Sequence, residues 1–304
     1  MSKSSLQINL EYAVARLLLA VFGALPPSVG LRVSSIMAGG AWYFAGRLRR
    51  TGERNLRLAF PELSPRKRRR LLRGCFQNLG RLLGVFSQFS YARTKTLRRL
   101  IDCEGLEHVE TAQRSGRGAI LFTGHVGAWE LTSFALSLFD HPLSFLVRRI
   151  DNSKVEALID RARTRLGNRT IDKTSAAREM LQILQTGGTL GILVDLNTLD
   201  REGIFVDFFD VPASTTFMLA KLALRTGADV LPIFAPWDKQ RGRFLLKIDA
   251  PLVIDRTGNE EEDVRRLTQS FTSVVENYVR RYPDQWLWIH RRWKTRPPGE
   301  PELY

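Results

Sequence analysis

Apolar and polar residues alternate in blocks after residue 116, and these blocks predict alternating strands and helices. Short apolar runs bounded by Gly or polar residues are typical of buried strands, and they lie at 119–123, 143–148, 189–195, 229–235 and 243–248. Apolar residues at helical spacing lie at 128–138, 153–166, 174–186, 214–226 and 260–281. Strands interleaved with amphipathic helices predict an α/β fold with a mixed, largely parallel central sheet flanked by helices.

The pattern before residue 91 is helical, without strand signals. Residues 6–25 are apolar, interrupted by Glu11 and Arg16, and the segment ends at Pro26-Pro27. A second apolar stretch covers 33–46. Neither supplies the roughly 20 apolar residues that a spanning helix needs, so we expect one or two helices lying in the membrane interface. An ordinary buried helical hairpin is the alternative. A third amphipathic helix is predicted at 64–90, after a Ser64-Pro65 start.

Charge changes this picture, because the formal net charge of +15 is concentrated in one part of the chain. Eleven basic residues lie between Arg47 and Arg73, opposed only by Glu53 and Glu62. Such a block favours an anionic partner, namely a phospholipid surface, an acidic protein or a nucleic acid. No helix-turn-helix or zinc-finger pattern follows the block, so we expect no nucleic-acid partner. A solvated helix face is the plainer alternative.

Composition indicates a chain with a sizeable core and no metal-binding pattern. Hydrophobic residues make up 44% of the chain, and the two cysteines, Cys75 and Cys103, form no CxxC pair. The four histidines are scattered without an HExxH motif, and there is no Walker or GxGxxG loop. We expect neither a metal nor an organic cofactor.

The candidate chemistry lies between the expected strand 119–123 and the expected helix 128–138. His125 lies in this turn, and Glu130 follows five residues later. On one regular helix the two would point about 140° apart, but a His125 placed before the helix can converge with Glu130. Gly124 and Gly127 supply the backbone freedom for such a turn. A carboxylate on one imidazole nitrogen would let the other nitrogen take a proton from a hydroxyl. A structural or merely exposed loop histidine is the alternative.

At this point the sequence resembles a family, the late acyltransferases of lipid A biosynthesis, which are lauroyl and myristoyl transferases of the bacterial inner membrane. The similarity covers nearly the whole chain in order. The matching segments are 54–63 (RNLRLAFPEL), 124–125 (GH), 129–131 (WEL), 152–167, 191–195 (GILVD), 203–206 (GIFV), 208–209 (FF), 212–213 (PA), 282–283 (YP) and 285–294 (QWLWIHRRWK).

The resemblance implies roles for individual residues. His125 would deprotonate an acceptor hydroxyl and Glu130 would orient His125, while the hydroxyl attacks an acyl carrier protein thioester. The acceptor would be a lipid A precursor or a related glycolipid. The candidate substrate-binding residues are Arg149, Arg163, Arg165 and Asp195. Arg163 could bind acceptor phosphate or steady Glu130, although residues 161–165 also fit a solvated helix face. Asp195 ends a strand, a favoured site position, but could instead cap a turn with Asn197.

Two departures from the family pattern leave the acceptor open. Ala128 stands where the family usually has Asn, and Asp210 where it often has Gly. The alternatives are therefore another acceptor, such as a phosphatidylinositol mannoside or an ornithine-type lipid, or a basic membrane-binding protein without chemistry. We expect a membrane-associated helical segment at 1–48 and an acyltransferase domain at 49–304, on the cytoplasmic face of the inner membrane.

Overall fold

A mixed, largely parallel sheet forms the centre of the computed structural model, which describes residues 4–172 and 176–304. Within these residues the sheet has eight strands: β1 (Ile101–Glu104), β2 (Ala119–Thr123), β3 (Ser144–Val147), β4 (Arg169–Asp172), β5 (Thr189–Leu193), β8 (Asp229–Phe234), β9 (Trp237–Asp238) and β10 (Arg243–Ile248). Their order is β1-β10-β8-β2-β5-β3-β4, with β9 also on β10. Only the β10–β8 and β10–β9 pairs are antiparallel. The predicted α/β class is confirmed.

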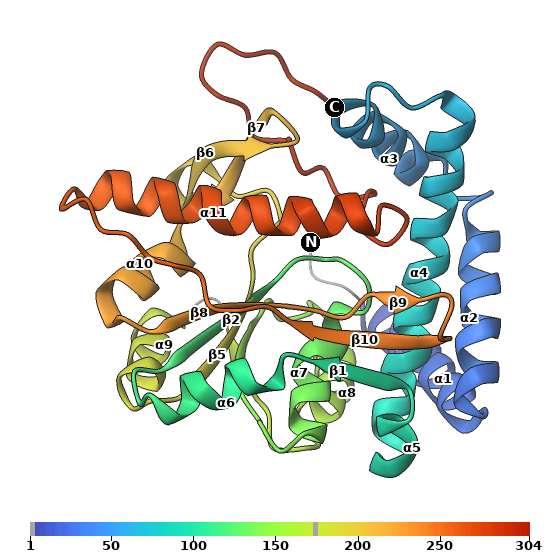
Figure 1. Cartoon of the computed structure of the whole chain (residues 1–304). Helices are drawn as coiled ribbons and strands as arrows, with labels where there is room; N and C mark the ends of the chain where they lie inside the picture. The colour runs from blue at the N-terminus through green and yellow to red at the C-terminus, as the bar shows by residue number, and fades with distance from the viewer. Residues whose placement is uncertain (1–3, 173–175) are drawn as a thin grey trace.

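Helices cover both faces of the sheet (Figure 1). They are α6 (Leu106–Arg114), α7 (Trp129–Leu138), α8 (Ser153–Thr164), α9 (Ala176–Gln185), α10 (Met218–Thr226) and α11 (Glu260–Arg281). Phe271 and Tyr278 of α11 pack on Phe122 and Phe234 of one sheet face. On the other face, Phe134 of α7 lies in a second core with the β2 and β8 side chains that point there.

The five predicted strands and five predicted helices are all present, with one boundary that was wrong. The helix predicted at 214–226 begins at Met218, because residues 214–216 belong to strand β7. Residues 174 and 175, the start of the helix predicted at 174–186, lie outside the described residues. The strands β1, β4, β6, β7 and β9 were not predicted, and β1, β4 and β9 have four residues or fewer, which carry little periodicity.

A hairpin of β6 (Gly203–Phe208) and β7 (Val211–Thr216) stands apart from the main sheet. Its two turn residues, Phe209 and Asp210, have φ values of 55° and 58°. Two-residue hairpin turns often require positive φ at both positions, and Asp tolerates it better than most residues. The backbone N–H of Phe209 donates to Glu276 of α11 at 2.6 Å. Asp210 is exposed whereas Phe209 is buried, so the departure from Gly falls at the exposed position of a turn that α11 holds in place.

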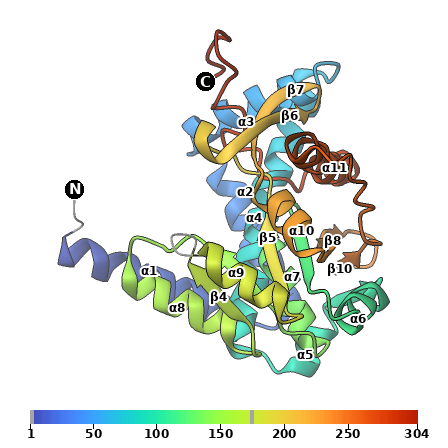
Figure 2. The ribbon, with the colours of Figure 1, turned by 90° about the vertical axis from the view of Figure 1, so that its left-hand side faces the viewer.

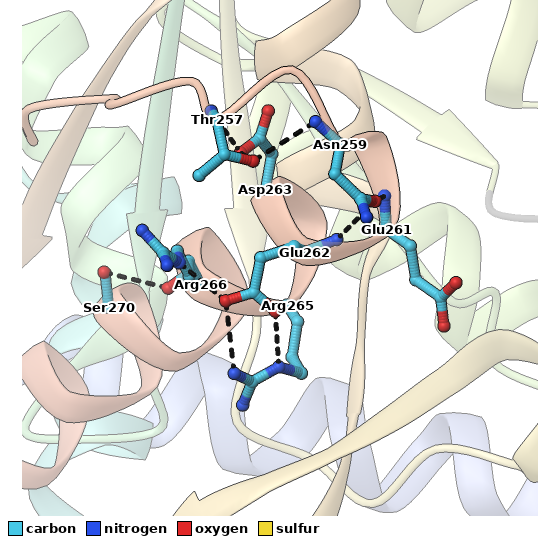
Figure 3. Close-up of polar contacts among 8 residues, drawn as sticks. All are labelled: Thr257, Asn259, Glu261, Glu262, Asp263, Arg265, Arg266 and Ser270. Atoms are coloured by element: carbon cyan, nitrogen blue, oxygen red, sulfur yellow. Dashed lines mark hydrogen bonds and ion pairs between the residues drawn. The ribbon is translucent and has the colours of Figure 1, made fainter.

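The long helix α11 begins at a dense set of side-chain caps (Figure 3). Asn259 accepts hydrogen bonds from the backbone N–H groups of Glu261 and Glu262. Asp263 accepts from the backbone and hydroxyl of Thr257. The bonds to Asn259 satisfy N–H groups that a helix start leaves without partners, and the bonds to Asp263 hold the preceding Thr257 against the first turn. Acidic residues at this end also interact favourably with the helix dipole. They fix where α11 starts, and α11 leads directly into the segment that closes the site.

The N-terminal helices pack together at one side of the sheet (Figures 1 and 2). They are α1 (Ser5–Ala24), α2 (Pro27–Ala41), α3 (Gly46–Ala59), α4 (Pro65–Tyr91) and the short α5 (Thr94–Arg98). A Cβ added to Gly80 of α4 would lie 2.2 Å from the carbonyl oxygen of Ser34, so glycine allows α2 and α4 to approach closely. Asn152, at the start of α8, donates to the Ile8 carbonyl and to Glu11, and so attaches α1 to α8.

Helix α1 has the length of the predicted apolar segment 6–25, but the expectation that this segment falls short of a membrane span is wrong. It has 20 residues and is, by length and composition alone, sufficient to cross a membrane. Its outer face carries an exposed apolar stripe, and α2 continues that exposure through Val29, Val33, Ile36 and Met37. The α1 stripe consists of Leu6, Leu10, Val14, Leu17 and Val21. An ordinary buried hairpin does not fit these exposed faces.

Candidate functional site

The site begins where β2 ends and the chain turns into α7. Gly127 has a φ of 67°, and a Cβ there would lie 2.3 Å from the Ala235 carbonyl oxygen. A Cβ on Gly124 would lie 2.9 Å from a carboxylate oxygen of Asp195. Glycine is therefore required at these two positions for different reasons. Gly127 makes the backbone conformation possible, whereas Gly124 leaves room for a carboxylate beside the turn.

That carboxylate, Asp195, is the centre of the site. Because β2 and β5 are parallel neighbours, their carboxyl ends place His125 and Asp195 side by side. One oxygen of Asp195 lies 2.7 Å from Nδ1 of His125. The other accepts from the backbone N–H of His125 and from the indole N–H of Trp286, each at 2.7 Å. Burial raises the pKa of Asp195, but His125 and these donors outweigh it, so the pKa lies below its usual range.

This contact fixes the tautomer of His125. An ionised carboxylate only accepts hydrogen bonds, so Nδ1 of His125 carries a proton toward Asp195. In the neutral ring Nε2 is then left as the basic nitrogen. His125 lines a cavity, so a base is available to a molecule bound there.

Glu130 does not fill the role that the sequence interpretation gave it. The Nδ1 position belongs to Asp195, and Glu130 instead pairs with Arg163 of α8. The guanidinium makes a two-point contact, with Nε–Oε2 at 2.9 Å and Nη2–Oε1 at 2.5 Å. Glu130 lies in the first turn of α7 and Arg163 in the last turn of α8, and their side chains meet. Burial lowers the pKa of Arg163, but the bond to Glu130 outweighs burial and raises it overall.

The other predicted site residues separate into two groups. Glu130 and Arg163 line the same cavity as His125. Arg149 and Arg165 do not line it. Arg149 pairs with Asp172 at 2.6 Å, and Arg165 donates to backbone carbonyls at the end of α4. The alternative in which Asp195 caps a turn with Asn197 is wrong, because Asn197 bonds to His290 and Thr295 instead.

The cavity has a volume of about 430 Å³ and runs from the polar site into the protein between the sheet and α7. Its inner part is lined by apolar side chains from four elements and the segment before β3, namely Leu121, Leu136, Leu143, Phe145 and Ile233. A Cβ on Gly191 would lie 2.9 Å from Leu143 and 3.0 Å from Phe145, so this glycine keeps the packing around the cavity close. A long apolar group with a reactive polar end fits this lining.

Residues 285–290 form a strap that closes the site from the C-terminal side, and the sequence interpretation assigned no role to it. Trp286 pairs with Val126 as an antiparallel bridge, and the backbone N–H of Leu287 donates to the His125 carbonyl at 3.2 Å. Gln285 accepts from the Gly127 N–H at 3.0 Å. The tryptophans of this segment were the available signal, because buried Trp N–H groups usually need a specific partner.

No metal-binding cluster of three or more His, Cys, Asp or Glu side chains exists in the described chain. Of the charged side chains named above, Glu130 pairs with Arg163, Arg149 with Asp172, and Asp195 contacts His125, whereas Arg165 binds backbone carbonyls. The arrangement is therefore suited to proton transfer at His125 and to binding an anionic group near Arg163.

Comparison with known proteins gives a family for this arrangement. The family model described as bacterial lipid A biosynthesis acyltransferase matches residues 2–295. The lipid A biosynthesis lauroyltransferase of Escherichia coli K12 is 28% identical over 92% of this chain and 90% of its own length. The palmitoleoyltransferase of the same organism is 27% identical over 86% and 83%. A lipid A biosynthesis acyltransferase of Haemophilus influenzae is 24% identical over 87% and 82%.

The lowered pKa of Asp195 predicts a pH-dependent contribution to stability. The unfolded-state pKa of Asp is about 3.9, and the folded-state value is lower, so the ionised group stabilises the fold above that pH. Stabilisation is lost as the pH falls through the folded-state value. We expect Asp195→Asn to lower the free energy of unfolding by about 1–3 kcal/mol at pH 7. The difference from wild type should shrink at pH 3, measured by urea denaturation.

The matched control is Asp140→Asn, since the Asp140 side chain is 92% exposed. It should change the unfolding free energy little at either pH. A gap between wild type and Asp195→Asn that is equally large at pH 7 and pH 3 would contradict the assignment.

Proposed function

The chain belongs to the bacterial lipid A biosynthesis acyltransferase family, and we propose that it transfers a fatty acyl chain from an acyl carrier protein thioester to a hydroxyl of a lipid A precursor. Membership makes the chain an acyltransferase. The observation that carries the finer proposal is the His125–Asp195 pair at the polar end of an apolar cavity. Such a cavity accepts an acyl chain and leaves its thioester beside a base.

His125 acts as the general base in this mechanism. Its Nε2 takes the proton of the acceptor hydroxyl while the oxygen attacks the thioester carbonyl carbon. Asp195 stabilises the imidazolium that forms, because it is ionised, buried and 2.7 Å from Nδ1. The imidazolium then gives its proton to the departing thiolate as the carbon–sulfur bond breaks. His125 therefore serves both halves of the reaction without a covalent enzyme intermediate.

Arg163 binds an acceptor phosphate, and Glu130 holds Arg163 in position. The Arg163 side chain lines the cavity, and its Nη1 has no hydrogen-bond partner in the described part of the chain. A guanidinium held at two points by a carboxylate keeps a fixed orientation, which suits recognition of a second, tetrahedral anion. Arg149 and Arg165 lie outside the cavity lining, so we assign them no contact with the substrate.

The enzyme lies on a membrane surface through α1 and α2. The exposed stripe of α1 faces away from α4 and α8, to which the opposite face of α1 is attached. A spanning orientation would draw the start of α8 into the bilayer, because Asn152 binds Ile8 and Glu11 of α1. An interfacial orientation satisfies both faces of α1. We place this surface on the cytoplasmic side of the inner membrane, with residues 1–48 as the attaching segment.

The basic block of residues 47–73 attracts the acidic partners. Arg66, Lys67, Arg69 and Arg70 are exposed on the first turns of α4. Electrostatic complementarity of this kind raises association rates more than it changes chemistry. Both an acyl carrier protein and an anionic lipid surface would be drawn to the block.

Loss of the His125 side chain should lower the rate of acyl transfer without unfolding the protein. We expect His125→Ala to lower kcat/KM for acyl transfer by about 10²–10⁴-fold, the typical range for loss of a general base. Mass spectrometry of the acceptor lipid gives the rate, with acyl carrier protein thioesters as donors. The matched control is His108→Ala, which alters a histidine outside the cavity lining. Activity of His125→Ala within a few-fold of wild type would disprove the mechanism.

Charge reversal in the basic block should weaken binding of the acyl carrier protein donor. We expect Arg66, Lys67 and Arg70 changed together to Glu to raise the apparent KM for acyl carrier protein several-fold. The kcat at saturation should change little, since screened charges act over about 8 Å at physiological ionic strength. Arg68 is left in place, because it donates to the Leu63 carbonyl. Steady-state kinetics at two salt concentrations measure both effects. A large fall in kcat with unchanged KM would contradict this role.

Changes to the α1 stripe should release the enzyme from membranes. Burying a Leu side chain stabilises association by about 1.5–3 kcal/mol, so Leu10→Glu with Leu17→Glu removes much of the attachment. We expect the double variant to move to the soluble fraction in high salt. The control is Val253→Glu, which alters a still more exposed apolar residue elsewhere. Protection of an N-terminal tag on the far side of the membrane would show that α1 spans the bilayer and would contradict this arrangement.

A further inference from the structure

A second histidine, His290, lines the same cavity as His125. It ends the strap of residues 285–290, whose earlier residues bind the His125 carbonyl and the Asp195 carboxylate. The strap therefore sets the positions of His125, Asp195 and His290 relative to one another. A histidine that only fills space on the strap would not need to reach the cavity, but this one is half-buried with a face toward it.

One hydrogen bond fixes which nitrogen of His290 carries the proton. The backbone N–H of Asn197 points at Nε2 at a distance of 3.1 Å. A backbone N–H can only donate, so Nε2 must be the unprotonated acceptor. The ring proton of neutral His290 is therefore on Nδ1. Nδ1 has no hydrogen-bond partner among the described residues, so it is a donor that remains available to a molecule in the cavity.

The surroundings keep His290 neutral. Burial lowers the pKa of His290 to about 4, with His125 and Arg292 acting in the same direction and Asp195 opposing them. At neutral pH the ring does not compete with His125 for the hydroxyl proton. A neutral N–H donor held rigidly in a partly buried site can still stabilise developing negative charge.

We propose that His290 is a catalytic residue whose Nδ1–H donates a hydrogen bond to the thioester oxygen as that oxygen becomes anionic. The inference rests on the proposed acyl transfer and adds the group that stabilises its intermediate. Asn197 holds His290 in the required tautomer through its backbone, so Asn197 is a positioning residue.

The reaction balances with these two histidines. The acceptor oxygen bonds to the carbonyl carbon, its proton moves to Nε2 of His125, and the carbonyl electron pair moves onto the oxygen. That oxyanion accepts the hydrogen bond from His290, which keeps its own proton throughout. The oxyanion then re-forms the carbonyl, the carbon–sulfur bond breaks, and the thiolate takes the proton from His125. The products are the acylated lipid and the free thiol.

The first test compares His290→Ala with His290→Gln in the full-length enzyme. Loss of a single oxyanion donor typically lowers kcat by about 10²–10³-fold, and we expect this for His290→Ala with little change in either KM. A Gln side chain has both an oxygen to accept from Asn197 and an N–H₂ to donate, so His290→Gln should recover part of the activity. Lauroyl-, myristoyl- and palmitoyl-acyl carrier protein serve as donors. The acid limb of the kcat/KM profile should remain in both variants, because His290 keeps its proton throughout the proposed reaction.

The second test is a binding measurement that a purely structural role would not affect selectively. A pantetheine alkylphosphonate carries a tetrahedral anion like the intermediate, whereas the matched alkyl thioether has no oxygen at that position. We expect His290→Ala to weaken phosphonate binding by at least tenfold and to leave thioether binding unchanged. Equal weakening of both ligands would overturn the proposal, as would a His290→Ala kcat within a few-fold of wild type.

The two proposals fail in different ways. If the wild-type enzyme acylates no lipid A precursor, the proposed function is wrong. If the wild type is active and the acid limb disappears from the profile of His290→Ala, His290 is the base and its assignment as an oxyanion donor is wrong. Equal loss of activity in the Ala and Gln variants, together with lowered melting temperatures, would make His290 structural and would also overturn the proposal.

Discussion

The buried carboxylate of Asp195 is the interaction on which the site depends. An ionised carboxylate inside a protein is costly unless donors surround it, and here the donors come from separate parts of the chain. His125 contributes its ring and its backbone, and Trp286 contributes its indole N–H. The carboxylate therefore joins the turn after β2, the end of β5 and the C-terminal strap. Its negative charge, in turn, orients His125 and favours the protonated form that proton transfer would produce.

The strap also ties the site to the N-terminal helices. Asn78 of α4 donates to the carbonyls of Gly127 and Gln285, and Asn55 of α3 donates to the carbonyls of Trp288 and His290. These amides are buried, and each bridges two backbone carbonyls of the strap or of the turn beside it. These bonds attach α4 and α3 to the segment that holds Asp195 and presents His290. Helix α4 in turn packs against α1 and α2, which we propose to lie on the membrane, so the proposed membrane surface is connected to the site through α4.

The cavity has an apolar interior and a polar end, and the two parts have different roles in the proposed reaction. Aliphatic and aromatic side chains between the sheet and α7 offer no group for chemistry, whereas His125, His290, Glu130 and Arg163 all lie toward its polar end. In the proposed reaction the acyl chain supplies binding through apolar burial, and the polar end acts only on the thioester and the acceptor. A base, a neutral donor and a cation then have separate tasks, because their surroundings hold them in different charge states.

Local patterns determined much of this protein. Apolar periodicity gave the α/β class and the main strands and helices, and the Gly-bracketed His125 at a strand end marked the site, because strand ends and tight turns have strong local signatures. Which side chains contact one another in the site was decided only by tertiary structure. Glu130 is near His125 in sequence, yet Asp195 takes Nδ1 because parallel pairing brings β5 beside β2, while α8 presents Arg163 to Glu130. The tautomer of His290 depends on the backbone of Asn197, 93 residues away. Sequence spacing cannot specify contacts between residues so far apart, since they exist only after the sheet has assembled and the C-terminal strap has packed against it.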